Sequence, residues 1–410
     1  MSILPLRNLR VINFGWVWVA PLMGHILADM GAEVFKVETR NRPDVIRILP
    51  PYMDEDLARE TGEQPLESLY AANTCRNYRG ITLDISTSEG QRLAKELVKS
   101  CDVVIENFSP KIMTRFGMGY EELRKLRPDV VMISASAAGK DGPQSGLVTY
   151  GGVVSALAGL DYHQGYPELG RPQAANTTIM DPLQGIYCAF AVLAAIRHRA
   201  RTGEGQHIDF AQWEAAATLV GGPMMEWVFN KRNSDPLGNR DEMMAPHGVY
   251  PSKGSDKWVS IAVKEEDEWR ALCDAMDRPG LVDDERFADQ YLRQINHDEL
   301  DEIISAWTKT KTHFQVTRML QKVGVAAFPS LNEPEVFDDK HFNAREDWID
   351  VEHPLGKQKI YGMQWKLSKT PGQIRTPGTM VGQYNDFAFR EVLGMPNGEI
   401  ERLGEKNVFY

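Results

Sequence analysis

The sequence predicts an α/β protein whose larger domain contains a parallel β-sheet and whose second, smaller domain is also of mixed αβ type. The chain has 410 residues, more than a single domain of roughly 100–200 residues usually holds. Strand-like and helix-like patterns alternate over residues 1–135, which is typical of helices packed on both faces of a parallel sheet. Apolar residues make up 42 % of the chain and charged residues 25 %, the balance of a folded globular protein.

The first 40 residues predict two strands separated by a helix. Leu9–Asn13 is a short apolar run with β-branched residues, typical of a buried strand. Pro21–Met30 has apolar residues at helical spacing and ends at Gly31, the usual helix terminator. Glu33–Glu38 alternates apolar and polar residues like a second strand.

The same alternation continues to residue 134. Ser88–Ser100 and Tyr120–Leu126 predict helices, and Asp102–Ile105 and Val130–Ser134 predict buried strands. We therefore expect a Rossmann-like sheet in this half of the chain. The first strand is not followed by G-x-G-x-x-G, which argues against an NAD-dependent dehydrogenase.

Further elements complete the large domain and build the small one. Residues 139–180 are expected to form loops around a site, followed by a long helix from about Pro182 to Arg199. The other expected elements are a strand at His207–Phe210, a helix at Trp213–Phe229, a hairpin of His247–Pro251 and Lys257–Val263, helices at Asp267–Met276 and Asp298–Thr308, strands at Ile349–Val351 and Met363–Leu367, and a closing helix at Asp386–Leu393.

Charge is distributed unevenly along the chain. The net charge is −11, and residues 261–350 alone hold 11 Lys/Arg and 21 Asp/Glu, a net of −10. We expect a large domain of residues 1–229, completed by 331–410, and a small domain of residues 230–330. A general nucleic-acid binder is excluded, because phosphate neutralisation needs a basic face. The nearly neutral large domain can still hold a locally positive groove.

Cysteine usage and hydropathy indicate a soluble cytoplasmic protein. Four widely spaced cysteines argue against a disulfide framework and a zinc site, and we expect no metal. The longest strictly apolar run, Tyr187–Ile196, is half a membrane span. The N-terminus lacks the layout of a signal peptide. We therefore expect no membrane association.

Asp181 is the first candidate for chemistry. It directly precedes Pro182 at the start of the long helix. Asp favours the N-cap and Pro the first helical turn, so the residue pattern alone favours a purely capping role. The alternative uses the same position, because a helix N-terminus keeps a carboxylate ionised and an ionised carboxylate can act as a covalent nucleophile.

A second group of candidates follows the ends of predicted strands, where ligands bind in open α/β sheets. Asn107 and Phe108 follow one strand, and Trp16 and Trp18 follow the first strand. These side chains are either turn and core residues or the walls of an apolar pocket. Arginines that can pair with phosphates are spread over the same half: Arg40, Arg42, Arg47, Arg76, Arg79 and Arg115.

Several longer strings resemble the class III CoA-transferase family, also called the CaiB/BaiF type. They are residues 27–38 (LADMGAEVFKVE), 102–110 (DVVIENFSP), 115–118 (RFGM), Asp181 with Gly185, 202–206 (TGEGQ), 246–250 (PHGVY), 284–287 (DERF) and 351–354 (VEHP). Their order and number carry the resemblance over nearly the whole chain. The resemblance implies a Rossmann-like large domain, a smaller αβ domain and an interlocked dimer, either a homodimer or a heteromer with a related subunit.

The resemblance also implies a catalytic cycle. Asp181 matches the family's nucleophile, which passes through mixed anhydrides and an aspartyl-CoA thioester. Coenzyme A thioesters and carboxylic acids are then the substrates, and no tightly bound cofactor is needed. Asn107, Phe108 and Arg115 match CoA contacts, and Arg40 lies in the basic loop where the nucleotide end docks. Arg76 or Arg79 is expected to replace a lysine that relatives carry.

Substrate and reaction type keep alternatives open. Residues 14–18 (FGWVW) and 149–154 (TYGGVV) look most like the benzylsuccinate branch, which uses succinyl-CoA as donor. Trp16, Trp18 and Tyr150 are then expected to line the acyl pocket. A 2-methylacyl-CoA racemase is disfavoured, because Thr149-Tyr150-Gly151 stands where racemases have a His. A CoA-binding subunit of a heteromeric transferase is the third alternative.

Overall fold

A computed structural model describes residues 3–52, 68–174 and 179–409 of the chain. It divides into two compact units. The larger consists of Met1–Leu160, Ala175–Val228 and Arg345–Tyr410, and the smaller of Asp161–Ala174 and Phe229–Ala344. Compared with the expected small domain of residues 230–330, the smaller unit extends to residue 344 and includes a segment from before the long helix.

The larger unit contains the predicted parallel sheet. Its six strands are ordered β3-β2-β1-β4-β5-β6, and all neighbours run parallel. Chain order is lost between β1 and β4, so the sheet has a topological switch point there. The strands are β1 (Arg10–Asn13), β2 (Glu33–Glu38), β3 (Tyr78–Thr82), β4 (Val103–Glu106), β5 (Val131–Ser136) and β6 (His207–Ala211).

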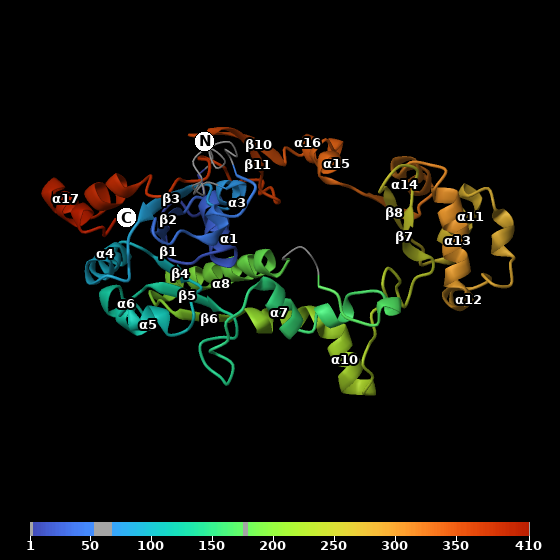
Figure 1. The fold of residues 1–410 in the computed structure, drawn as a ribbon, viewed down its shortest axis with the longest axis horizontal. Coiled ribbons are helices and arrows are strands. Elements are labelled where there is room, and N and C mark those ends of the chain that lie inside the picture. The colour runs from blue at the N-terminus through green and yellow to red at the C-terminus, as the bar shows by residue number, and fades with distance from the viewer. Residues whose placement is uncertain (1–2, 53–67, 175–178, 410) are drawn as a thin grey trace. The chain divides into compact units, whose positions relative to one another are not determined.

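Helices cover both faces of this sheet (Figure 1). Successive strand residues point to opposite faces, so Val11 belongs to one core and Ile12 to the other. The first core includes α1 (Val19–Asp29) and α8 (Met180–Thr202), and the second includes α4 (Ser88–Lys99). The carboxyl ends of the strands are left for a ligand site.

The smaller unit has its own antiparallel sheet and core. Strands β7 (His247–Pro251), β8 (Trp258–Ala262) and β9 (Ala326–Ser330) pair in sequence order. The fully buried Trp269 is the largest side chain of the core between this sheet and its helices. Those helices are α11 (Glu266–Ala275), α12 (Gln290–Ile295), α13 (His297–Thr308) and α14 (His313–Lys322).

The remaining elements are short. In the larger unit they are α3 (Leu69–Thr74), α5 (Ile112–Arg115), α6 (Tyr120–Leu126), α7 (Gly151–Leu157), α9 (Gln212–Ala217), the antiparallel pair β10 (Trp348–His353) and β11 (Gly356–Tyr361), a π-helix at Phe387–Val392 and α17 (Asn397–Glu405). Helix α10 (Gly221–Asn230) follows α9, and α15 (Glu333–Phe337) and α16 (Lys340–Ala344) end the smaller unit. Within the described ranges, no helix combines the length and apolar composition that a membrane span needs.

The structure departs from the sequence predictions in several places. Met363–Leu367 is not a strand; the partner of β10 is β11, which lies closer along the chain. The expected helix at Trp213–Phe229 is interrupted by a 3₁₀ turn at Thr218–Val220. Strand β3 was not predicted, because its sequence, YRGIT, contains an Arg and a Gly within five residues.

Candidate active site

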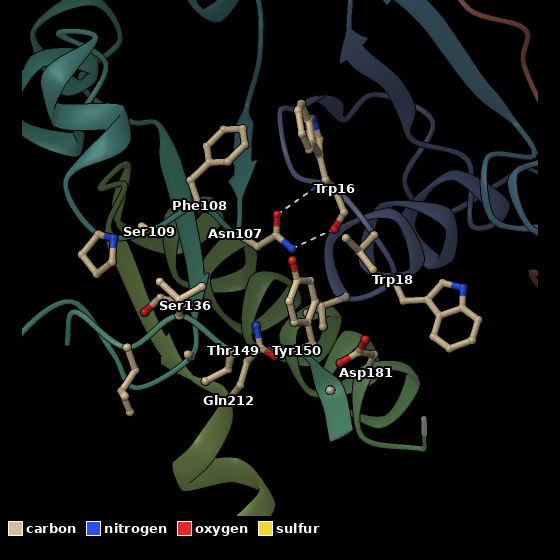
Figure 2. Close-up of a pocket in the computed structure, with 17 residues that line it drawn as sticks. Trp16, Trp18, Asn107, Phe108, Ser109, Ser136, Thr149, Tyr150, Asp181 and Gln212 are labelled. Atoms are coloured by element: carbon tan, nitrogen blue, oxygen red, sulfur yellow. Dashed lines mark hydrogen bonds between the residues drawn. The ribbon is translucent and has the colours of Figure 1, made fainter. Parts of the chain in front are cut away.

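A cavity of about 220 Å³ lies in the larger unit, at the carboxyl ends of β1, β4 and β5 (Figure 2). This position beside the switch point is where open α/β sheets bind ligands. The lining residues are Trp16, Val17, Trp18, Val19, Asn107, Phe108, Ser109, Pro110, Ser136, Ala137, Leu147, Val148, Thr149, Tyr150, Gly151, Asp181 and Gln212. The predicted site residues Trp16, Trp18, Asn107, Phe108, Tyr150 and Asp181 are therefore brought together.

Asp181 is the only charged side chain among these lining residues. It is 7 % exposed, and burial alone raises the pKa of its carboxyl group to about 6. A helix N-terminus is expected to lower the pKa of a carboxyl group. The pKa of Asp181 is raised instead, because desolvation disfavours the charged form. At neutral pH the group is still mainly a carboxylate, and it is poorly solvated.

Asp181 does not cap its helix. Helix α8 begins at Met180, one residue before Asp181, and its N-cap residue is Ile179, which makes no side-chain capping bond. The helix start expected at about Pro182 is thus too late, and Asp181 lies inside the first turn. The purely capping alternative for this residue is wrong, so its carboxylate stays available to the cavity.

Two tryptophans on the loop after β1 form one wall of the cavity. The Trp16 ring meets Phe108 edge-on, with ring centroids 6.0 Å apart, and the Arg42 guanidinium lies 5.0 Å from the centre of the Trp16 ring. Trp18 makes an edge-to-face contact with Tyr70 at 5.6 Å. These contacts fix bulky apolar surfaces around the site. In Figure 2, Trp18 and Asp181 lie toward one end of the cavity and Ser136 toward the other.

Asn107 holds the loop after β1 in place. Its Oδ1 accepts a hydrogen bond from the Trp16 N–H at 2.8 Å, and its Nδ2 donates to the Trp16 carbonyl at 2.8 Å (Figure 2). Both ends of the amide are therefore engaged by the protein. Asn107 therefore binds the backbone of Trp16, a residue of the cavity wall. Its position at the end of a strand does not by itself predict this contact.

A buried ion pair lies beneath the same loop and was not predicted. Lys36 Nζ is 2.7 Å from Asp44 Oδ2, and both side chains are fully buried. Burial acts to lower the pKa of Lys36, but the carboxylates of Asp44 and Glu38 raise it on balance. Beside this pair, Glu38 forms a bidentate pair with buried Arg47. Charged residues scattered over residues 36–47 give no periodic signal, so the sequence conceals this network.

The predicted CoA-binding arginines occupy different environments. Arg76 is buried, and its guanidinium binds Asp29 at 2.6 Å and also Asn73, so it is not placed to reach a ligand. Arg79 is half-buried, pairs with Glu33 at 2.9 Å and lies over the Phe387 ring.

Two other arginines are exposed. Arg40 donates to the Val381 carbonyl. Arg115, at the end of α5, has no ion-pair partner within the described part of the chain. Neither belongs to the cavity lining, so the expected positive groove is not formed by the lining residues themselves.

Two polar residues that were not among the predicted site residues, Ser136 and Gln212, also line the cavity. Ser136, at the end of β5, is 4 % exposed, and its hydroxyl has no hydrogen-bond partner among the described residues. Gln212 donates from Nε2 to the Ala135 carbonyl at 3.0 Å. Over the described ranges, His, Cys, Asp and Glu side chains do not gather into groups of three or more that could hold a metal ion.

Comparison with known proteins agrees with this architecture. The model of CoA-transferase family III matches residues 6–385. A succinyl-CoA–D-citramalate CoA-transferase from Chloroflexus aurantiacus is 33 % identical over 405 residues, covering 98 % of both chains. A succinate–glutarate CoA-transferase from Agrobacterium fabrum is 32 % identical and covers 95 % of this chain and 96 % of the relative.

Two further similarities concern assembly and fold. The β subunit of a succinyl-CoA–L-malate CoA-transferase from Chloroflexus aurantiacus is 30 % identical, covering 99 % of this chain and 98 % of the subunit. The crystal structure of a CaiB/BaiF family protein from Brucella suis superimposes with a TM-score of 0.86 at 28 % identity, covering 96 % of this chain and all of that one.

Proposed function

The chain belongs to CoA-transferase family III and is a CoA-transferase, and we propose that it moves CoA from succinyl-CoA to a carboxylic acid through a covalent intermediate on Asp181. The observation that carries this proposal is the position of Asp181, a buried carboxylate with a raised pKa at the sheet's switch point. Among the described residues that line this cavity, it is the sole charged group. A desolvated carboxylate suits nucleophilic attack on a thioester.

The steps conserve the energy of the thioester. An Asp181 oxygen attacks the succinyl carbonyl carbon, the C–S bond breaks, and a mixed anhydride forms as CoA thiolate leaves. The thiolate attacks the Asp181 carbonyl carbon, which releases succinate and forms an aspartyl-CoA thioester. The acceptor carboxylate then displaces the thiolate to form a second anhydride. Attack of the thiolate on the acceptor carbonyl finally yields the new acyl-CoA and regenerates the Asp181 carboxylate, with no net proton uptake.

The acceptor is proposed to be a dicarboxylic acid. Relatives that resemble the chain over nearly its whole length are named for citramalate, malate and glutarate, and their partner in the reaction is succinate or succinyl-CoA. Trp16 and Trp18 line the cavity, and their indole surfaces favour contact with an apolar substituent. The proposed acceptors therefore include dicarboxylic acids with an aromatic substituent, such as benzylsuccinate. Ser136 and Gln212 offer polar contacts to the substrate in the same cavity.

CoA binding is proposed to involve residues beside the cavity. Phe108 lines it, and exposed Arg115 and Arg40 come from elements that follow the sheet's carboxyl edge. An Arg115→Ala variant is expected to raise the KM for succinyl-CoA with little change in kcat, since phosphate contacts contribute equally to the ground state and the transition state.

A dimer is proposed from the apolar surface of the larger unit. Ile186 and Phe190 on α8 are 49 % and 73 % exposed, and Met224 on α10 is 56 % exposed. Apolar side chains in such number usually face a partner, here a second copy or a related subunit. Sedimentation velocity over a wide dilution range tests this, because an interlocked dimer keeps its mass on dilution and a monomer contradicts the proposal.

The racemase alternative needs two acid/base groups on opposite sides of the α-carbon. Among the lining residues Asp181 is the only carboxylate and no His is present, so transfer is favoured. Loss of α-deuterium from a 2-methylacyl-CoA, without CoA transfer to any acid, would reverse this choice.

The covalent step can be tested directly. The wild-type protein is incubated with succinyl-CoA, treated with hydroxylamine, and digested for mass spectrometry of the Asp181 peptide. A hydroxamate on Asp181, absent from an Asp181→Ala control, is expected. Absence of an adduct with every acyl-CoA of a panel, in a protein that still binds CoA, would instead identify a non-catalytic CoA-binding subunit.

A further inference from the structure

Val17 has an unusual backbone conformation between the two cavity tryptophans. Its φ is 66°, in the left-handed region that β-branched residues rarely enter. Such conformations persist only where the surrounding structure enforces them, and they occur preferentially at functional sites. Because Val17 connects Trp16 to Trp18, its φ determines how both indole rings are presented to the cavity.

The enforcing contacts come from the buried Lys36–Asp44 pair. Asp44 Oδ1 accepts a hydrogen bond from the Val17 N–H at 2.8 Å, while its Oδ2 faces Lys36 Nζ at 2.7 Å. Lys36 Nζ also donates to the Gly15 carbonyl at 2.6 Å. One ion pair thus binds the backbone on both sides of Trp16, and Asn107 binds Trp16 itself.

The neighbouring Glu38–Arg47 pair provides an internal comparison. It is equally buried, with a nitrogen–oxygen distance of 2.8 Å. Arg47 donates to the Thr379 carbonyl rather than to the loop. A buried ion pair needs further hydrogen bonds to offset its desolvation, and the Lys36–Asp44 pair makes these bonds with the loop that carries the two tryptophans.

We propose that Lys36 and Asp44 are positioning residues for CoA transfer, which hold the loop of residues 15–17 in a strained conformation so that Trp16 and Trp18 enclose the acyl group attached to Asp181. The inference rests on the proposed role of Asp181. The pair acts through the backbone and touches no substrate. Misplacement of about 1 Å at a reacting group can lower the rate about 100-fold, so a shift of this loop lowers kcat.

The test is a double-mutant cycle between Asp44→Asn and Val17→Gly. Glycine adopts positive φ without steric cost, so with Gly at position 17 the loop can keep its conformation without the contact from Asp44. Asp44→Asn is expected to lower kcat per folded molecule about 100-fold in the wild-type background. In the Val17→Gly background the same change is expected to lower kcat much less. Asp29→Asn, which breaks the buried Asp29–Arg76 pair away from this loop, is the matched control and is expected to lower the folded fraction without this selective loss of kcat.

Hydrogen exchange supplies a readout that does not depend on activity. In Asp44→Asn, exchange is expected to rise in peptides covering residues 14–20 and to stay unchanged in the peptides of β4. If exchange rises uniformly, or if Val17→Gly leaves the kcat loss unchanged, the positioning role is overturned. If Asp44→Asn does not fold, Lys36→Arg replaces it in the cycle, because it keeps the charge but alters the geometry toward Gly15.

The two proposals fail in different ways. A wild-type protein that transfers no CoA to any acid contradicts the proposed function, whereas the exchange pattern still tests whether Lys36 and Asp44 hold the loop in place. A wild-type protein that transfers CoA, combined with an additive double-mutant cycle, contradicts only the positioning role.

Discussion

The side-chain amide of Asn107 holds both the N–H and the carbonyl of Trp16 at 2.8 Å. Asn107 follows β4 and Trp16 follows β1, so the two bonds join the two strands that flank the switch point of the sheet. This amide therefore ties the cavity wall to the sheet edge, in addition to the contacts that Lys36 and Asp44 make with the same loop.

Replacing Asn107 by Asp is expected to disrupt this contact. A carboxylate still accepts from the Trp16 N–H, but it cannot donate to the Trp16 carbonyl and repels it. Because this hydrogen bond is part-buried, an acceptor left without a partner costs up to about 1–3 kcal/mol, so the melting temperature and kcat/KM are both expected to fall. Asn397→Asp, the same charge change at the exposed start of α17, is the control. Unchanged turnover in Asn107→Asp would contradict a positioning role for the amide.

The activity should depend on the ionisation of Asp181. Burial raises the pKa of the proposed nucleophile, the Asp181 carboxyl group, to about 6. Activity is therefore expected to be present above that pH and to be lost as the pH falls through it. The expected profile of kcat/KM has an acid limb near pH 6 with a slope of about one. If the acid limb reflects the ionisation of Asp181, its midpoint should be the same for acceptor acids of different pKa. A limb that follows the acceptor's own pKa would contradict the assignment.

The same raised pKa implies a stability cost. Asp181 ionises more easily in the unfolded chain, near 3.8, than in the fold, near 6. Ionisation of Asp181 therefore lowers the free energy of unfolding. This cost is absent below the unfolded-state pKa, grows as the pH rises toward the folded-state pKa, and is constant above the folded-state pKa. At about 1.4 kcal/mol per pKa unit the cost is about 3 kcal/mol at neutral pH.

Asp181→Asn should therefore stabilise the protein while abolishing transfer. Denaturant unfolding at pH 7.5 is expected to show a gain on the order of 2 kcal/mol that shrinks toward pH 4. Asp141→Asn, the same change at an exposed position, should show no such trend. If Asp181→Asn is less stable than the wild type at both pH 7.5 and pH 4, desolvation is not the cause of the raised pKa.

Much of the sheet could be predicted from local patterns. The alternation of apolar and polar residues predicts a strand at Glu33–Glu38, with the bounds that the structure gives. Met363–Leu367 shows a similar alternation but has no strand to pair with. Alternation indicates a possible strand, whereas pairing depends on the rest of the fold.

The candidate site was predicted only in part, for a related reason. Asp181 and the tryptophans stand beside recognisable helix starts and strand ends. Lys36 and Asp44 are charged, and charged residues are rarely fully buried unless paired. Their pairing is a tertiary contact, so no local pattern separates them from surface residues. For Arg76 the error is in the other direction. The sequence suggests a cation that binds CoA, whereas in the structure Arg76 forms a buried ion pair with Asp29.

A last prediction concerns the contact between α1 and α8, which sets the position of Asp181. Gly185 lies one turn after Asp181, and a Cβ atom there would come within 3.1 Å of Leu22 Cβ and 3.2 Å of the Val19 carbonyl oxygen. Gly185→Ala is therefore expected to push the start of α8 away from α1. Overpacking of this kind costs about 1–3 kcal/mol, and displacement of Asp181 lowers kcat further.

The control for this substitution is Gly404→Ala in α17, where an added Cβ meets no atom within 4 Å. Alanine is favoured over glycine inside a helix by about 0.5–1 kcal/mol, so this variant should be slightly more stable and equally active. Thermal unfolding and kcat are measured for both variants. If Gly185→Ala matches the control in both, α8 tolerates the added methyl, and close packing against α1 does not determine where the Asp181 carboxylate lies.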